Sequence, residues 1–167
     1  MINFSEKDFE YFDYICEHKR NVMKAYNVLM KNNPFDEVEK PMIDKVLKNR
    51  VLNHDLSKFS PEQFKPYRKH FYPNNKDEEE SNGFEEAWKY HYNNERHHPE
   101  RYNGEENMRS LDVLEMCLDW YAMSLKFGDN TLEYYNNKKD ELRKEHPWLI
   151  EEYDGLITKV LESMCDE

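Results

Sequence analysis

Glycine and cysteine are scarce in this sequence, and it has no long apolar run. Only four glycines and three cysteines occur among its 167 residues. Cys16, Cys117 and Cys165 lie far apart and form no Cys-x-x-Cys pair, which argues against a zinc ribbon or a disulfide framework. No segment has the length of a membrane span, and no apolar leader occupies the N-terminus. We therefore expect a reduced, cytoplasmic protein with no membrane partner.

The charge is strongly negative. The formal net charge is -11, and charged residues make up 35% of the chain. An acidic protein repels phosphate backbones, so duplex nucleic acid is not an expected partner. The hydrophobic fraction is low at 38%, and the aromatic fraction is high at 14%, which predicts an aromatic-rich core. The length predicts a single domain over residues 1–167.

Apolar residues recur mainly at spacings of three and four, which predicts an all-α fold. We expect a compact bundle of about six or seven helices. Ser5, the Ser60-Pro61 pair and Ser110 are expected starts, and Gly128 an expected end. The expected helices cover residues 5–30, 36–54, 60–73, 84–94, 110–126 and 131–145, and a last one opens at Pro147.

Two helices have predicted buried faces, and two segments are predicted loops. The first helix should bury a stripe that contains His18, together with Tyr11, Ile15, Val22, Ala25 and Leu29. The second should bury Val38, Met42, Val46 and Leu47. The acidic stretch 74–83 and the Pro- and Gly-containing stretch 97–104 are predicted to be loops.

Histidine and aspartate are spaced along the chain in a pattern that suggests a metal site. The doublet His54-Asp55 is preceded by one histidine and followed by three more and an aspartate: His18, then His91, His97, His98 and Asp119. Imidazole nitrogens and carboxylate oxygens bind divalent metals. Asp119 shares a helix face with Met116 and Met123, and a partly buried carboxylate there requires a compensating cation. The sequence therefore predicts a metal site assembled from several helices.

This ordered set resembles the HD superfamily of metal-dependent phosphohydrolases. His18, His54-Asp55 and Asp119 match its pattern in order, and the stretch from His54 to Lys58 is similar to a His-Asp-x-x-Lys form. The whole chain looks like a group of short HD-like proteins of bacteria and their phages. The run 97–104 resembles the His-His-Glu loop of members that cleave cyclic dinucleotides, but a proline precedes its glutamate and the Gly-Tyr-Pro tripeptide is missing.

The resemblance implies an HD-like fold with one or two divalent ions, of Mn, Ni, Co, Mg, Zn or Fe. It gives Lys58 a role in binding substrate phosphate and makes Asp55 a bridging ligand. His91, His97 and His98 are candidates for a second ion, with His70 a weaker one. Metal-bound water, with its pKa lowered from about 15.7 towards ~7, would attack a phosphoester. The substrate would be a nucleotide or another small phosphorylated metabolite.

Neighbouring residues suggest further contacts with such a substrate. Arg96 and Arg101 flank the His-His pair, where they would clamp a phosphate or else pair with nearby glutamates. Four aromatic residues could stack on a nucleobase, although the helical spacing puts at least half of them in the core: Trp88, Tyr90, Tyr92 and Tyr102.

Four other interpretations compete with this one. A His- and Asp-rich site with two irons would make the protein an HD-type di-iron oxygenase. A ferritin-like centre fits less well, because Glu95-x-x-His98 is a single Glu-x-x-His motif where that fold needs two. Without turnover, the chain would be an acidic helical binding protein, which leaves the buried histidines and aspartates unexplained. A closed structural metal site would need fewer ligands than are present.

Overall fold

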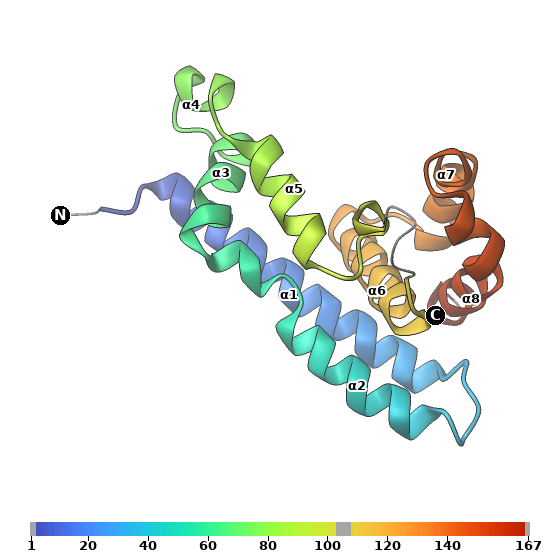
Figure 1. Ribbon diagram of the computed structural model, residues 1–167. Helices are drawn as coiled ribbons and strands as arrows, with labels where there is room; N and C mark the ends of the chain where they lie inside the picture. Colours follow the sequence, from blue (N-terminus) through green and yellow to red (C-terminus); the bar gives the residue numbers. More distant parts are fainter. Residues whose placement is uncertain (1–2, 103–107, 166–167) are drawn as a thin grey trace.

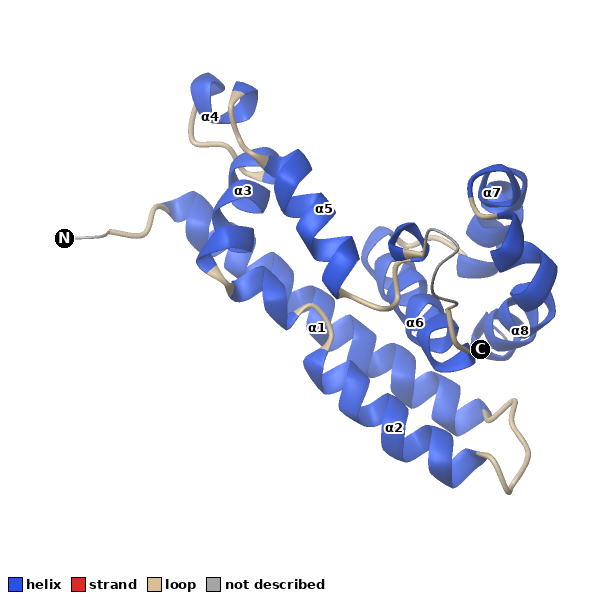
Figure 2. Ribbon diagram, in the orientation of Figure 1, coloured by secondary structure: helices blue, strands red, loops and turns tan. Residues whose placement is uncertain are grey.

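The computed structural model describes residues 3–102 and 108–165, and these are helical with no strand (Figure 2). The predicted all-α fold is confirmed, with one more α-helix than the seven segments expected. The α-helices are α1 (Glu6–Asn32), α2 (Lys40–Asn53), α3 (Pro61–Phe71), α4 (Lys76–Glu80), α5 (Phe84–Asn94), α6 (Ser110–Phe127), α7 (Thr131–Glu145) and α8 (Pro147–Cys165). Two short 3-10 helices are η1 (Leu56–Phe59) and η2 (Pro99–Arg101).

The longest helix, α1, connects the two ends of the molecule. Its start at Ser5 is a capping box, in which Asp8 Oδ2 accepts from the Ser5 N–H at 2.7 Å. The predicted stripe is buried, His18 included. In Figure 1, α2 runs back alongside α1, and α3 to α5 gather near the N-terminal end of α1. Helices α6 to α8 lie beside the C-terminal half of α1.

The second helix differs from the prediction in its start and in its buried face. It begins at Lys40 rather than Asp36, because Asp36 Oδ1 accepts from the N–H groups of Val38 and Glu39 in a preceding turn. Three residues expected in the core lie partly or largely outside it, with exposed fractions of 87%, 66% and 37% for Val38, Met42 and Val46. Leu47, as predicted, and Val51 are buried instead.

The acidic stretch predicted as a loop contains the short helix α4. The Asn75 side chain accepts from the Glu78 N–H at 3.0 Å and caps its start. Glu78 also pairs with Arg68, which is buried on α3 and lies 3.0 Å from Asp8 through Nε. The acidic stretch 74–83 is therefore attached to α3 through Arg68, which its composition did not indicate.

Glu78 gives a pH-dependent prediction. Hydrogen bonding to Arg68 lowers its pKa to about 2 from the usual 4.5. The pair therefore stabilises the fold above about pH 4.5, and this contribution is lost as the pH falls towards 2. We expect Glu78→Gln to lower the free energy of unfolding by up to about 1 kcal/mol at pH 7. Urea unfolding at pH 7 and pH 3 should show the difference from wild type shrinking. A difference that stays constant with pH would contradict this.

The other predicted boundaries agree with the structure, with one exception. Ser60 and Pro61 begin α3, Pro147 begins α8, and Gly128 ends α6 with a φ of 76°. The cap of α6 is Arg109 rather than Ser110, since Asp112 Oδ2 accepts from the Arg109 N–H at 2.9 Å. The predicted loop 97–104 contains η2, and its last two residues lie outside the described part of the chain.

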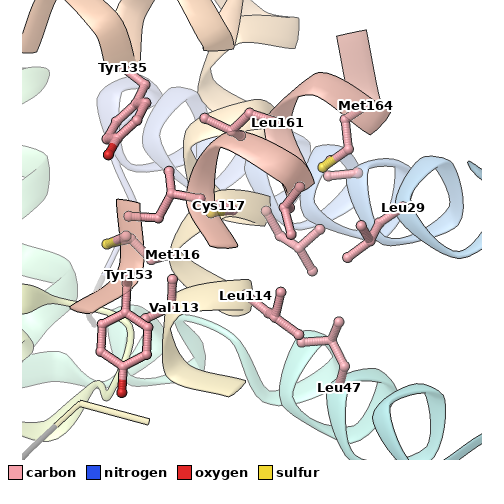
Figure 3. Packing of buried hydrophobic residues seen from close by; sticks show 14 of the residues in the cluster. Leu29, Leu47, Val113, Leu114, Met116, Cys117, Tyr135, Tyr153, Leu161 and Met164 are labelled. Atoms are coloured by element: carbon pink, nitrogen blue, oxygen red, sulfur yellow. The ribbon is translucent and has the colours of Figure 1, made fainter. Parts of the chain in front are cut away.

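Two hydrophobic clusters fill the interior. The larger one joins α1, α2, α6, α7 and α8; Figure 3 shows Leu29 of α1, Leu47 of α2, Leu114 and Cys117 of α6 and Leu161 of α8 gathered in this cluster. The smaller contains Tyr11, Ile15, Tyr67 and Ala87 from α1, α3 and α5. His18 follows Ile15 of the smaller cluster and precedes Val22 of the larger one, so it marks the boundary between them.

None of the helices in the described part of the chain combines the length and the apolar character that crossing a bilayer requires.

Candidate metal centre

The His-Asp doublet lies where the chain leaves α2. His54 ends the helix, and Asp55 adopts a left-handed conformation with a φ of 57°. Non-glycine residues rarely adopt this conformation, although aspartate and asparagine tolerate it better than most. Both side chains are buried, each 1% exposed. The local turn therefore directs two adjacent polar side chains into the interior.

Four nitrogen and oxygen atoms from α1, the doublet and α6 converge on one point. His18 Nε2 lies 3.1 Å from Asp119 Oδ1, 3.3 Å from His54 Nε2 and 3.5 Å from Asp55 Oδ2. His54 Nε2 lies 3.6 Å from Asp119 Oδ1 and 3.7 Å from Asp55 Oδ2. Ligands about 2.1 Å from an ion are separated from one another by roughly 3 to 3.4 Å. The spacing of this first set fits a single ion.

A second set forms around the other oxygen of Asp55. Asp55, His91, His97 and His98 each offer one ligand atom, and these atoms lie within 4.8 Å of one another. Asp55 Oδ1 is 3.3 Å from His91 Nε2 and 3.7 Å from His97 Nε2. His54, His97 and Asp119 also form such a group, which connects the two sets. Asp55 is therefore the residue that the two sets share.

The second set carries the strongest indication of a missing ligand. Asp55 Oδ1 and the Nε2 atoms of His91, His97 and His98 are buried without a hydrogen-bond partner. A buried polar atom without a partner costs about 1–3 kcal/mol. Four such atoms directed at one another fit a cation that all of them bind. The donor set of imidazoles and one carboxylate suits a divalent transition metal.

Glu115 is a site residue that the sequence analysis missed. Its Oε1 lies 3.0 Å from His54 Nδ1 and 3.6 Å from His97 Nδ1. A carboxylate that accepts a hydrogen bond from Nδ1–H leaves the lone pair of Nε2 free to bind a metal, and it fixes the orientation of the ring. Glu115 precedes Asp119 by one helical turn, so helical periodicity alone could have placed it on the same face. It is hydrogen-bonded to His54 of the first set and lies near His97 of the second.

Ser57 and Glu95 play the corresponding part for His91. Ser57 Oγ donates to Glu95 Oε1 at 2.7 Å and lies 3.4 Å from His91 Nδ1. Ser57 was not among the candidate site residues predicted from the sequence. Since Ser57 lies on η1 and Glu95 at the end of α5, their contact also joins these two elements.

Lys58 lies at the edge of the centre. Its Nζ is 2.6 Å from Asp55 Oδ2 and 5.5 Å from the centroid of the Tyr67 ring. Burial opposes the charge of the ammonium group, but the charge of Asp55 outweighs burial and raises the pKa of Lys58 above its usual value. The side chain is 18% exposed, so the cation is reachable from outside.

The two predicted arginine ligands have other contacts. Arg96 Nε and Nη2 donate to the carboxylate of Asp112 at 3.0 and 3.2 Å, and Arg101 donates to the backbone carbonyl of Asn93. Asp112 is fully buried and also pairs with Arg50. These contacts fasten the His97–His98 segment to α5 and α6. Phosphate binding by either arginine stays a prediction.

Burial and neighbouring charges shift the pKa values of the histidines and aspartates in the cluster. Burial disfavours the imidazolium of His54, but Asp55, Asp119 and Glu115 outweigh it and raise the pKa to about 10. Burial and the nearby charge of His54 lower the pKa of His97 to about 3. Despite burial, neighbouring cationic groups hold the pKa of both aspartates well below the usual range. Ionised carboxylates and a neutral His97 are the forms that bind metals, whereas His54 must release a proton when a metal binds.

Other candidate residues lie apart from this cluster. His70 is stacked on Phe84 with ring centroids 3.9 Å apart and joins none of the metal-ligand groups found among the described residues. Tyr102 is buried in the larger hydrophobic cluster, so its ring is not available to a nucleobase. Trp88 packs edge-on against His98 at 5.0 Å and lines a cavity beside the centre.

The fold and this cluster define an all-α protein with buried groups suited to a metal ion. The chain belongs to DUF5662, a family of unknown function, whose model matches residues 7–167. Searches of curated proteins and of solved structures gave no significant match.

Proposed function

We propose that this protein is a metal-dependent phosphohydrolase, a phosphomonoesterase or phosphodiesterase that acts on a nucleotide or another small phosphorylated metabolite. The observation that carries the proposal is the arrangement around Asp55, whose two oxygens face separate sets of buried imidazoles. The resemblance to HD phosphohydrolases in His18, His54-Asp55, Lys58 and Asp119 supports it. The proposal places this chemistry at the junction of the two hydrophobic clusters.

The residues divide into two ligand sets and one substrate contact. One ion would be held by His18, His54, Asp55 and Asp119; a second would be held by Asp55, His91, His97 and His98. A bound divalent ion supplies Lewis acidity and a hydroxide nucleophile near neutral pH.

Glu115 and Lys58 complete the proposed mechanism. Glu115 would accept a hydrogen bond from His54 Nδ1–H, which directs the lone pair of Nε2 toward the ion. Lys58 stays protonated because Asp55 stabilises its charge, and its side chain is partly open to solvent, from where it would donate to a phosphoryl oxygen. As charge develops on the phosphoryl group, this ammonium stabilises the transition state. Replacement of Lys58 should therefore affect turnover more than metal binding.

The first test combines elemental analysis with a panel of phosphoesters. The protein purified without added metal should contain divalent metal, and it should hydrolyse phosphoesters in a metal-dependent way. Two irons per chain with oxygen uptake would favour the oxygenase instead. No bound metal, even after soaking with manganese or nickel, would favour a non-catalytic binding protein.

Lys58→Ala tests the substrate contact. We expect kcat/KM to fall by about a hundredfold or more, since removal of one transition-state donor has effects of this order. The metal content should stay at the wild-type value. Lys65→Ala, at an exposed position on α3, is the matched control and should leave both quantities unchanged. Unchanged kcat/KM in Lys58→Ala would remove the assigned role.

A further inference from the structure

A cavity of about 280 Å³ adjoins the proposed metal centre. His97, His98 and Asp119 line it where it meets the centre, and Trp88, Trp120 and Tyr134 form aromatic walls. Trp120 and Tyr134 meet at an interplanar angle of 69° with ring centroids 6.1 Å apart, so they make a corner. His97 is 1% exposed, and neither of its ring nitrogens has a hydrogen-bond partner. The cavity therefore begins at polar atoms with no hydrogen-bond partner in the protein and continues past aromatic rings.

The part of the cavity lining supplied by η2 and α7 is acidic. It includes Glu100, Glu141, Glu145 and a single cation, Lys138. Lys138 Nζ lies 2.7 Å from Glu141 Oε2, so this pair adds little net charge. Two glutamates remain in excess beside the aromatic corner. Aromatic faces and carboxylates both attract cations and disfavour anions.

We propose that this cavity binds a positively charged ammonium group, so that the substrate is a small phosphoester of a cationic amine. This inference rests on the proposed phosphohydrolase function. The phosphoryl group would lie at the metal ligands and Lys58, and the ammonium group at the aromatic corner. Hydrolysis would break the phosphorus–oxygen bond, with water adding hydroxide to phosphorus and a proton to the departing amino alcohol. A nucleobase would gain stacking here but little from the excess carboxylates.

Phosphocholine and 3,3-dimethylbutyl phosphate test the inference, because they have nearly the same shape and differ in the charged nitrogen. We expect the metal-loaded protein to bind phosphocholine about tenfold more tightly by calorimetry, and to hydrolyse it with a kcat/KM higher by a similar factor. Adenosine monophosphate serves as the nucleotide comparison. Equal affinity and equal kcat/KM for the two isosteres, or a preference for the nucleotide over both, would overturn the inference.

The double variant Glu141→Gln with Glu145→Gln should abolish the preference for phosphocholine while leaving metal content unchanged. Both glutamates are exposed, so the variant is expected to fold. Glu151→Gln, exposed on α8 away from the cavity lining, is the control and should keep the preference. Trp120→Leu should also reduce it. A preference that survives the double variant would contradict the assignment.

The two proposals can fail separately in these experiments. Hydrolysis of both isosteres at equal rates would leave the phosphohydrolase in place and remove the ammonium site. Selective binding of phosphocholine without hydrolysis of any phosphoester would keep the ammonium site and remove the proposed function.

Discussion

On the proposed function, replacing Asp55 with Asn should abolish the binding of metal at both ligand sets. One carboxylate oxygen lies 3.5 Å from His18 Nε2 and the other 3.3 Å from His91 Nε2, so one residue serves both sets. The amide lacks the charge and has only one oxygen to offer. Asparagine tolerates the left-handed backbone at this position, so the local conformation should persist. We expect phosphoesterase activity to fall about a thousandfold or more, because metal ions supply several kcal/mol of transition-state stabilisation.

Elemental analysis of wild type, Asp55→Asn and His98→Ala gives the comparison. His98 belongs to the second set only, so its replacement should spare the ion held by His18, His54 and Asp119. Circular dichroism should show that all three proteins keep their helices. If Asp55→Asn retains as much metal as His98→Ala, Asp55 is not the shared ligand.

Asp112→Ala should cause a large loss of stability. The carboxylate is fully buried, pairs with Arg50 and Arg96, and accepts from the Arg109 N–H at the start of α6. Its removal takes a shared counter-charge from two partly exposed guanidinium groups and a hydrogen-bond acceptor from the start of α6, which together cost about 2–3 kcal/mol. Urea unfolding would measure the change. Because Arg96 directly precedes His97, we also expect weaker metal binding.

Asp154→Ala is the matched control for this prediction. Asp154 accepts from Tyr135 at 2.7 Å and pairs with Lys139, but its side chain is 35% exposed. An exposed ion pair contributes at most about 1 kcal/mol. Asp112→Asn should recover part of the stability, because its amide oxygen can still accept a hydrogen bond. If Asp112→Ala and Asp154→Ala lower the free energy of unfolding equally, the burial of Asp112 adds nothing to the stability that its ion pairs provide.

Local periodicity predicted much of the fold and failed where two faces of one helix were equally apolar. The stripe of α1 has no competing face, so its burial could be predicted together with that of His18. In α2, Met42 and Val46 form one stripe, while Leu47 and Val51 lie on another; Val38 lies in the turn before the helix. Only the packing against α1 and α6 decides between them.

In the candidate site, too, local sequence predicted some residues, and others depend on contacts between distant parts of the chain. Chemical type and order suggested the histidines and aspartates that the structure gathers, and their binding of metal stays a prediction. Arg96 was predicted to contact substrate or a neighbouring glutamate, and its partner Asp112 is sixteen residues away. Long-range pairing of this kind leaves no local pattern. Glu115 was within reach of sequence reasoning, since it lies one turn from Asp119 on α6.

The position of the candidate ligands at the boundary of the two hydrophobic clusters has a consequence for the unfolded chain. On the proposed function, an ion links α1 to α6 across a hundred residues of sequence and so closes a long loop, as a covalent cross-link would. Its binding free energy then becomes folding free energy. The supply of metal would therefore govern how long each molecule resists proteolysis, as well as how fast it turns over substrate.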